Sequence, residues 1–305
     1  MTNAMINGFE ERWLFVENKR KLRIGLRQAG EQVLFLMHGV TRCWRDWEPI
    51  IPFLDPAWTI FALDHRGHGE SDRADSYFVR DYTKDLVEVL NQIVDTKVVL
   101  VGHSLGAMVA AYGAGEVPER VKGVVMEDPP FLTMGQGIAG STWQALFQGM
   151  HQVAQTVEES RSGSEGDGEG SGTVMGIDQI ARLLGEVVIR ESEAGTVRLR
   201  DVRNREALLW GASCLQHVDP AVFETLVSGQ WLDGYNPKEV ASKLGVPSVL
   251  LQADFAAGGA LSDEEARLFS QGAAQCEWKR FPGKNHQLHG TIPGEIAAEI
   301  NRFLA

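Results

Sequence analysis

The sequence predicts an α/β protein in which a mostly parallel, doubly wound sheet of eight strands is interrupted by a helical cap. Three observations lead to this prediction. Short apolar runs alternate with helical patterns up to about residue 128. Only helical patterns follow until about residue 244, and the strand–helix alternation then resumes. We therefore expect a core domain of residues 1–128 and 245–305 and a cap (lid) domain of residues 129–244.

Eight segments have the character of strands. The first two read as a hairpin around Asn18–Lys21, and most of the others are short apolar runs typical of buried strands. The expected strands are Trp13–Glu17, Leu22–Arg27, Val33–Met37, Thr59–Leu63, Val98–Val101, Val121–Met126, Ser248–Gln252 and Cys276–Phe281.

Helical periodicity or composition marks the segments between the strands and the whole cap. In the core we expect helices over Tyr82–Ile93, Ala107–Gly115, Ser262–Ser270 and Pro293–Leu304. In the cap we expect them over Trp143–Val157, Ile177–Arg190, Val202–Leu215 and Ala221–Leu226. Residues 160–172 consist almost wholly of Gly, Ser, Glu and Asp, which bury no apolar area, so a mobile acidic loop is expected there.

Composition excludes several classes of function. The 305 residues carry 29 basic and 41 acidic side chains, a net charge of −12, which argues against a nucleic-acid partner. The apolar runs are too short to cross a membrane, and the first ten residues lack the pattern of a secretory signal. Three cysteines without zinc-site spacing read as thiols of a reducing compartment, so we expect a cytoplasmic protein. The expected partner is a small-molecule substrate. No metal or cofactor motif is visible, and a homodimer is left open.

The strongest chemical signal is the pentapeptide Gly102-His103-Ser104-Leu105-Gly106. It follows an expected buried strand and opens an expected helix, which is the context that gives a G-x-S-x-G motif its meaning. A sharp turn there lifts the serine hydroxyl out of the sheet edge, and glycines at both ends leave the room that the turn needs. The pattern predicts that Ser104 is a nucleophile, which requires a neighbouring base.

Four motifs together resemble the α/β-hydrolase superfamily along nearly the whole chain. They are His38-Gly39 (an oxyanion loop), Asp64–Ser71 (a D-x-R-G-x-G-x-S stretch), Gly102–Gly106 (a nucleophile elbow) and Gly283–His286 (a histidine loop). The resemblance implies the α/β-hydrolase fold with a helical cap over the sheet edge, and a hydrolase that needs no cofactor. It does not specify the substrate, because this fold hosts many chemistries.

The resemblance also implies where the general base lies. Family members present the nucleophile, the acid and the histidine in that order along the chain. His286 follows the last expected strand and is the predicted base. His289, three residues later, is the competing candidate.

Three carboxylates compete for the role of the acid. Asp128 follows the strand Val121–Met126, 24 residues after Ser104, a position similar to that in haloalkane dehalogenases and in resorcylic-lactone (zearalenone-type) hydrolases. Asp254 follows the strand Ser248–Gln252, the commoner place in the family, but stands early in that loop. Glu127 is the third candidate, and strand alternation lets only one of Glu127 and Asp128 face the histidine. We favour Asp128 and keep Asp254 as the alternative acid.

Further positions follow from the resemblance or from residue type. By family position, the backbone N–H groups of Val40 and Leu105 form the oxyanion hole. Large aromatic side chains after the oxyanion loop and in the cap either line the substrate pocket or pack in the core. The predicted pocket residues are Trp44, Phe131, Trp143, Trp210 and Trp231.

These features predict a serine hydrolase that cleaves a carboxylic ester or lactone with an apolar or aromatic body. A C–C bond hydrolase of diketone-type substrates and a non-catalytic small-molecule sensor on the same fold are the alternatives. Haloalkane dehalogenation and epoxide hydrolysis are disfavoured, because a carboxylate holds the elbow in those branches and Ser104 holds it here.

Overall fold

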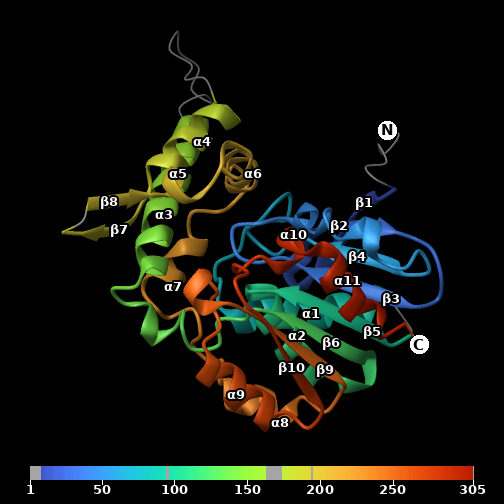
Figure 1. Ribbon diagram of the computed structural model, residues 1–305. Helices are drawn as coiled ribbons and strands as arrows, with labels where there is room; N and C mark the ends of the chain where they lie inside the picture. Colours follow the sequence, from blue (N-terminus) through green and yellow to red (C-terminus); the bar gives the residue numbers. More distant parts are fainter. Residues whose placement is uncertain (1–7, 94–95, 163–173, 194, 305) are drawn as a thin grey trace.

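The computed structural model of the protein describes residues 8–93, 96–162, 174–193 and 195–304. Its centre is an eight-stranded sheet with the strand order β1-β2-β4-β3-β5-β6-β9-β10. The first two strand pairs, β1–β2 and β2–β4, are antiparallel, and all the others are parallel. The predicted fold class, a mostly parallel doubly wound sheet of eight strands, is therefore confirmed (Figure 1).

The strands of this sheet lie close to the segments that the sequence predicts. They are β1 (Glu10–Val16), β2 (Arg20–Arg27), β3 (Val33–Met37), β4 (Thr59–Leu63), β5 (Val98–His103), β6 (Val121–Glu127), β9 (Ser248–Ala253) and β10 (Cys276–Phe281).

The central strands are buried on both faces, as parallel strands covered by helices should be. Along β5, Val98 and Leu100 enter one hydrophobic core, whereas Val99 and Val101 enter a second core on the opposite face. The helices that pack in the first core are α1 (Val79–Ile93), α2 (Leu105–Glu116), α9 (Asp263–Gly272) and α8 (Pro237–Lys243), the last of which contacts α2 and α9. The second face is covered by the short 3₁₀ helices η2 (Trp44–Trp47) and η3 (Ile51–Phe53), with α10 (Leu288–Thr291) and α11 (Pro293–Asn301).

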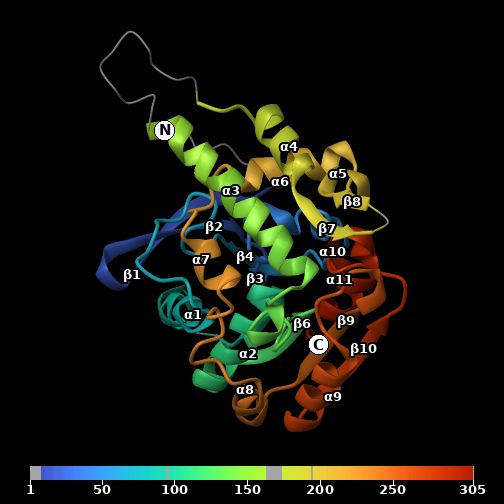
Figure 2. The same ribbon diagram turned by 90° about the vertical axis from the view of Figure 1, so that its left-hand side faces the viewer.

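The chain between β6 and α8 builds a separate group of helices to one side of the sheet (Figure 1). Seen from that side, the long helix α3 lies in front of the sheet (Figure 2). We refer to these elements as the cap. Its elements are α3 (Thr142–Ser162), α4 (Ile177–Glu186), β7 (Val188–Ser192), β8 (Gly195–Arg198), α5 (Leu199–Val202), α6 (Arg205–Leu215) and α7 (Val222–Val227).

The hairpin β7–β8 corrects the prediction that the cap is helical throughout. The expected helix Ile177–Arg190 ends at Glu186, and the run Val187-Val188-Ile189 that follows favours extended backbone because its side chains are β-branched. Both strands are largely exposed, so the sequence contains no apolar run long enough to indicate a buried strand there. Most of the expected acidic loop 160–172 lies outside the described residues, and α3 extends to Ser162. None of the described helices is both long and apolar enough to span a membrane.

Candidate active site

The turn between β5 and α2 places Ser104 at the edge of the sheet. Its backbone adopts φ +54° and ψ −113°, a strained conformation for a residue with a side chain. Its N–H donates to the carbonyl oxygen of Glu127 over 2.8 Å, and its own carbonyl accepts from Ala107 and Met108 at the start of α2. Strained backbone that is held this firmly is typical of functional positions.

The glycines of the pentapeptide are required by close packing, as the sequence predicts. A Cβ atom on Gly102 would collide with the backbone of Gly106, and one on Gly106 would collide with the carbonyl group of Met37. A Cβ atom on Gly39 would lie 3.3 Å from the Cβ of Ser104, so the loop after β3 passes directly against the serine. Val40 therefore lies beside Ser104, while its role and that of Leu105 in an oxyanion hole stay predictions.

Strand register brings Asp128 beside Ser104. His103, the last residue of β5, pairs with Glu127, the last residue of β6, so the two residues that follow these strand ends are neighbours. Asp128 also has a positive φ, +46°, and its side chain is fully buried. The two residues with strained, positive-φ backbone, Ser104 and Asp128, thus lie at the same edge of the sheet.

Asp128 holds the imidazole of His286. The Nδ1 of His286 donates to Oδ2 of Asp128 over 2.6 Å. The backbone N–H groups of Ala260 and Ala253 donate to the two carboxylate oxygens over 2.7 and 3.1 Å, which fixes the carboxylate in place. Because Nδ1 is committed to Asp128, Nε2 is the ring nitrogen left for Ser104.

Asp254, the alternative acid, accepts hydrogen bonds from the backbone N–H groups of two loops. Its side chain caps the 3₁₀ helix η6 (Phe255–Ala257) by accepting from the N–H of Ala256 over 2.9 Å, and it accepts from the N–H of Gly283 over 2.8 Å. These backbone hydrogen bonds lower the pKa of its carboxyl group. Asp254 thus ties the loop after β9 to the loop that carries His286, whose Nδ1 binds Asp128.

Glu127, the third candidate, pairs with the competing histidine. Both carboxylate oxygens of Glu127 lie 2.9 Å from Nδ1 of His289, and Nε2 of His289 lies 3.3 Å from Oδ2 of Asp46. All three side chains are buried. The two carboxylates raise the pKa of His289 to about 10 against the opposing effect of burial, so this imidazole is charged at neutral pH.

His103 packs against both His286 and His289. Its ring centre lies 4.5 Å from that of His286 and 5.0 Å from that of His289. Its Nε2 donates to the backbone carbonyl of His286 over 3.0 Å. Burial lowers the pKa of His103 well below its usual value, so the ring is neutral and supports the loop of His286 without adding charge.

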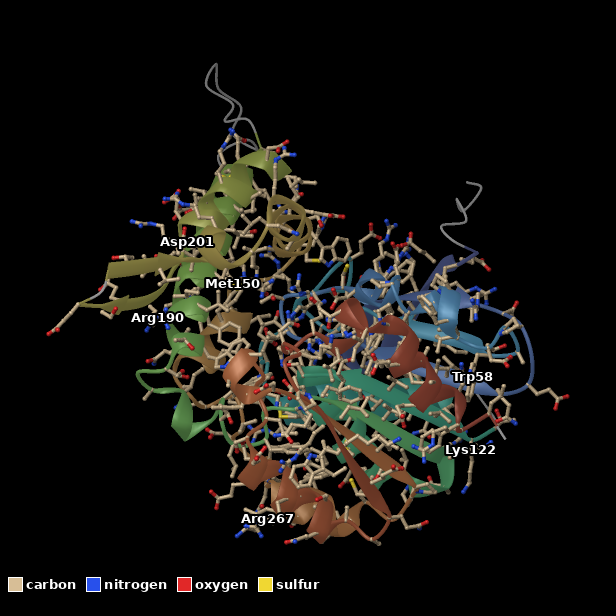
Figure 3. All side chains as sticks on the ribbon, in the orientation of Figure 1. Trp58, Lys122, Met150, Arg190, Asp201 and Arg267 are labelled. Carbon is tan, nitrogen blue, oxygen red and sulfur yellow. The ribbon has the colours of Figure 1, made fainter. Side chains whose placement is uncertain are left out.

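A cavity of about 920 Å³ lies over these residues, between the sheet edge and the cap. Ser104, His103 and His286 line its floor, and helix α3 lines one wall with apolar side chains. These are Trp143, Leu146, Phe147 and Met150. Met150, on helix α3 of the cap, is labelled in Figure 3. Ser104 and His286 therefore share one cavity with an apolar wall.

Comparisons with known proteins identify the fold. Residues 32–164 match the family model described as alpha/beta hydrolase fold. The crystal structure of E-2-(acetamidomethylene)succinate hydrolase superposes on 97% of the chain and 99% of its own chain, with a TM-score of 0.68 at 19% identity. The chain therefore has the α/β-hydrolase fold, and the match to the family model covers less than half of its length. At this level of identity the superposition concerns the fold alone.

Curated relatives match a limited part of the chain. The 2-(acetamidomethylene)succinate hydrolase of Mesorhizobium japonicum is 34% identical over 110 residues, which are 35% of this chain and 40% of the relative. Epoxide hydrolase B of Mycobacterium tuberculosis is 35% identical over 117 residues, which are 37% of this chain and 32% of the relative. The chain thus matches less than half of the length of these relatives.

Of the five predicted pocket aromatics, the structure brings Trp143 to the described cavity wall, with its ring centre 5.3 Å from that of His286. The other four expectations are corrected, because these rings find partners elsewhere. Trp44 packs on Phe9 and Gly25, Phe131 stacks on Phe269, Trp231 is fully buried and Trp210 donates through Nε1 to Asp46.

Sequence reasoning missed three charged residues of the cavity. Arg42, Arg190 and Arg203 line it, and the cavity-lining residues that the structure describes include no Asp or Glu. Arg42 stands two residues after Val40, which was the only local signal in the sequence. Arg190 and Arg203 lie in the cap, more than eighty residues from the elbow, and only the folded chain shows that they converge on it. No group of three or more His, Cys, Asp or Glu suited to a metal occurs in the described part of the chain.

Proposed function

We propose that the protein is a serine hydrolase in which Ser104, His286 and Asp128 form the catalytic triad. One observation supports this most strongly: the hydrogen bond of 2.6 Å between His286 and a buried Asp128, next to the strained turn that presents Ser104. A carboxylate on Nδ1 fixes the tautomer in which Nε2 accepts a proton, and it stabilises the imidazolium that forms. This is the arrangement that converts a serine hydroxyl into a nucleophile.

The proposed reaction has two steps. Ser104 Oγ attacks the acyl carbon while its proton passes to Nε2 of His286, and the N–H groups of Val40 and Leu105 stabilise the oxyanion. The C–O bond to the leaving group then breaks, and His286 returns the proton to that oxygen. Water attacks the acyl-enzyme and gives a proton to Nε2 of His286. The bond between the acyl carbon and Ser104 Oγ then breaks, His286 returns the proton to Oγ, and the acid product leaves.

The proposed substrate is a carboxylic ester or lactone with an apolar body. The apolar wall of α3 supports an apolar body, because it offers contact area beside Ser104. The names of the relatives include a hydrolase of 2-(acetamidomethylene)succinate and an epoxide hydrolase. Epoxide opening is not proposed here, because serine replaces the carboxylate that the epoxide branch carries at the elbow.

Active-site labelling tests the proposal independently of the natural substrate. A fluorophosphonate probe should add to the wild-type protein in a one-to-one ratio, and Ser104→Ala should remain unlabelled by intact mass spectrometry. A panel of p-nitrophenyl esters of graded acyl length, with aromatic lactones, would then define the acyl preference. An inert wild-type protein that binds small molecules tightly would contradict the proposal and favour the sensor alternative.

A further inference from the structure

The charges of the cavity have the opposite sign to the charge of the protein. The chain carries twelve more acidic than basic side chains. In contrast, the cavity-lining residues that the structure describes include three arginines and no Asp, Glu or Lys. A concave, partly dry surface of one sign attracts ligands of the opposite sign and strengthens their binding.

Arg42 lies beside the reacting centre and is incompletely neutralised. Its side chain is 12% exposed, and its Nε lies 3.9 Å from Oδ1 of Asp46, a long ion pair. Asp46 is already engaged, because Trp210 and Gln287 donate to the same oxygen over 3.0 and 2.9 Å and His289 faces the other oxygen. Arg42 thus has hydrogen-bonding capacity left toward the cavity.

Arg203 approaches the same space from the cap. It lies between α5 and Asn204, the N-cap of α6, is partly buried, and has no ion-pair partner among the residues that the structure describes. Burial and the charge of Arg42 lower its pKa to about 10, so the two guanidinium groups repel each other and both remain charged at neutral pH. A partly buried cation without a counterion is costly unless a ligand supplies one.

We infer that Arg42 and Arg203 form an anion subsite that holds a carboxylate of the substrate, with the scissile acyl group at Ser104. A planar guanidinium pairs with both oxygens of a carboxylate, and two such groups from the core and the cap can hold it from two sides. Arg190, which is exposed on β7 and labelled in Figure 3, stands at the cavity rim, where its charge guides anions inward. The substrate class is an ester or lactone with an apolar segment and a free carboxylate; this assignment rests on the proposed function.

The test compares acid esters with uncharged esters of similar length. p-Nitrophenyl hydrogen adipate is paired with p-nitrophenyl heptanoate, which places the charge on the acyl side. 4-Carboxyphenyl hexanoate is paired with phenyl hexanoate, which places it on the leaving group. For at least one pair we expect kcat/KM of the acid ester to be at least tenfold higher than that of its uncharged partner. A single hydrogen bond to a charged group contributes enough free energy for a difference of this size.

The variant Arg203→Met should reduce that acid-to-neutral ratio about tenfold or more, and Arg203→Lys should reduce it less. Arg205→Met is the matched control, because Arg205 is 81% exposed, pairs with Asp178 and lies off the described cavity wall, so the ratio should not change. If neither acid ester is preferred in the wild type, or if Arg203→Met and Arg205→Met give the same ratio, the subsite is refuted.

A binding measurement separates this inference from the proposed function. Adipate binding to Ser104→Ala, followed by calorimetry, needs no turnover and should weaken at least tenfold when Arg203→Met is added. Fluorophosphonate labelling reports on Ser104 alone. Labelling without adipate binding would overturn the subsite only, whereas adipate binding without labelling would overturn the proposed hydrolase and leave the subsite in place.

Discussion

Two histidine–carboxylate pairs lie side by side in this protein, and they differ in burial and in the number of carboxylates that face the imidazole. Asp128 binds His286, and its sequence neighbour Glu127 binds His289. In the first pair, His286 lines the cavity with its side chain 18% exposed, and Asp128 is buried behind it. In the second pair, His289 and Glu127 are both completely buried. The first imidazole has one carboxylate partner, on Nδ1, and the described residues place no second carboxylate on its Nε2. The second imidazole lies between two carboxylates.

The difference shows why one pair is suited to catalysis and the other to structure. A general base needs a nitrogen that is open to the reacting group and a pKa that allows proton exchange at neutral pH. His289 has neither, because both ring nitrogens face carboxylates and its pKa is raised to about 10. Through Asp46, which accepts from Trp210 and Gln287, it instead links the core to the cap.

The largest expected effect comes from removing the histidine of the first pair. In His286→Ala, kcat for a p-nitrophenyl ester should fall about 10⁶-fold, because serine and histidine of a triad act as a unit. The variant should stay folded, since His286 is at the cavity wall. Activity would be measured together with circular dichroism. A loss of less than a hundredfold in a folded variant would transfer the base role to another group.

Removing the histidine of the second pair should cost stability. In His289→Asn, two buried carboxylates lose their shared cation, and we expect the free energy of unfolding to fall by about 3–5 kcal/mol in urea titrations. His217→Asn is the control, because His217 is exposed in the cap and makes no ion pair in the described part of the chain. An unchanged urea midpoint in His289→Asn would contradict the structural role.

The same pair predicts a pH dependence. The pKa of His289 is about 10 in the folded protein and about 6.5 in the unfolded chain. Because folding raises this pKa, the stabilising contribution is complete below pH 6.5 and is lost as the pH rises to about 10. The difference in unfolding free energy between wild type and His289→Asn should therefore shrink over this range. A constant difference from pH 6.5 to 10 would show that the imidazole does not change protonation there.

Much of the sheet and of the geometry around Ser104 was predictable from local signals. Apolar runs such as Val98–Val101 indicate buried strands. The glycines on either side of Ser104 indicate a tight turn, because a Cβ atom at either position would collide with backbone atoms. Strand alternation also anticipated that Glu127 and Asp128 serve different partners.

The cavity wall was harder to predict, because it depends on how the cap docks on the core. An aromatic residue at helical spacing packs equally well inside the cap or against the substrate, and only Trp143 of the five predicted aromatics reaches the described wall. The convergence of Arg42 and Arg203 joins residues 161 positions apart in the sequence, which no local pattern encodes.

The most direct test of the central claim compares two aspartate variants by their rate of fluorophosphonate labelling at Ser104. Asp128→Asn should slow labelling about 10⁴-fold, because the histidine loses the partner that fixes its tautomer. Asp254→Asn should label within about threefold of the wild-type rate, because Asp254 accepts from backbone N–H groups of two loops and His286 is held by Asp128. Fast labelling of a folded Asp128→Asn protein, with slow labelling of Asp254→Asn, would contradict the account.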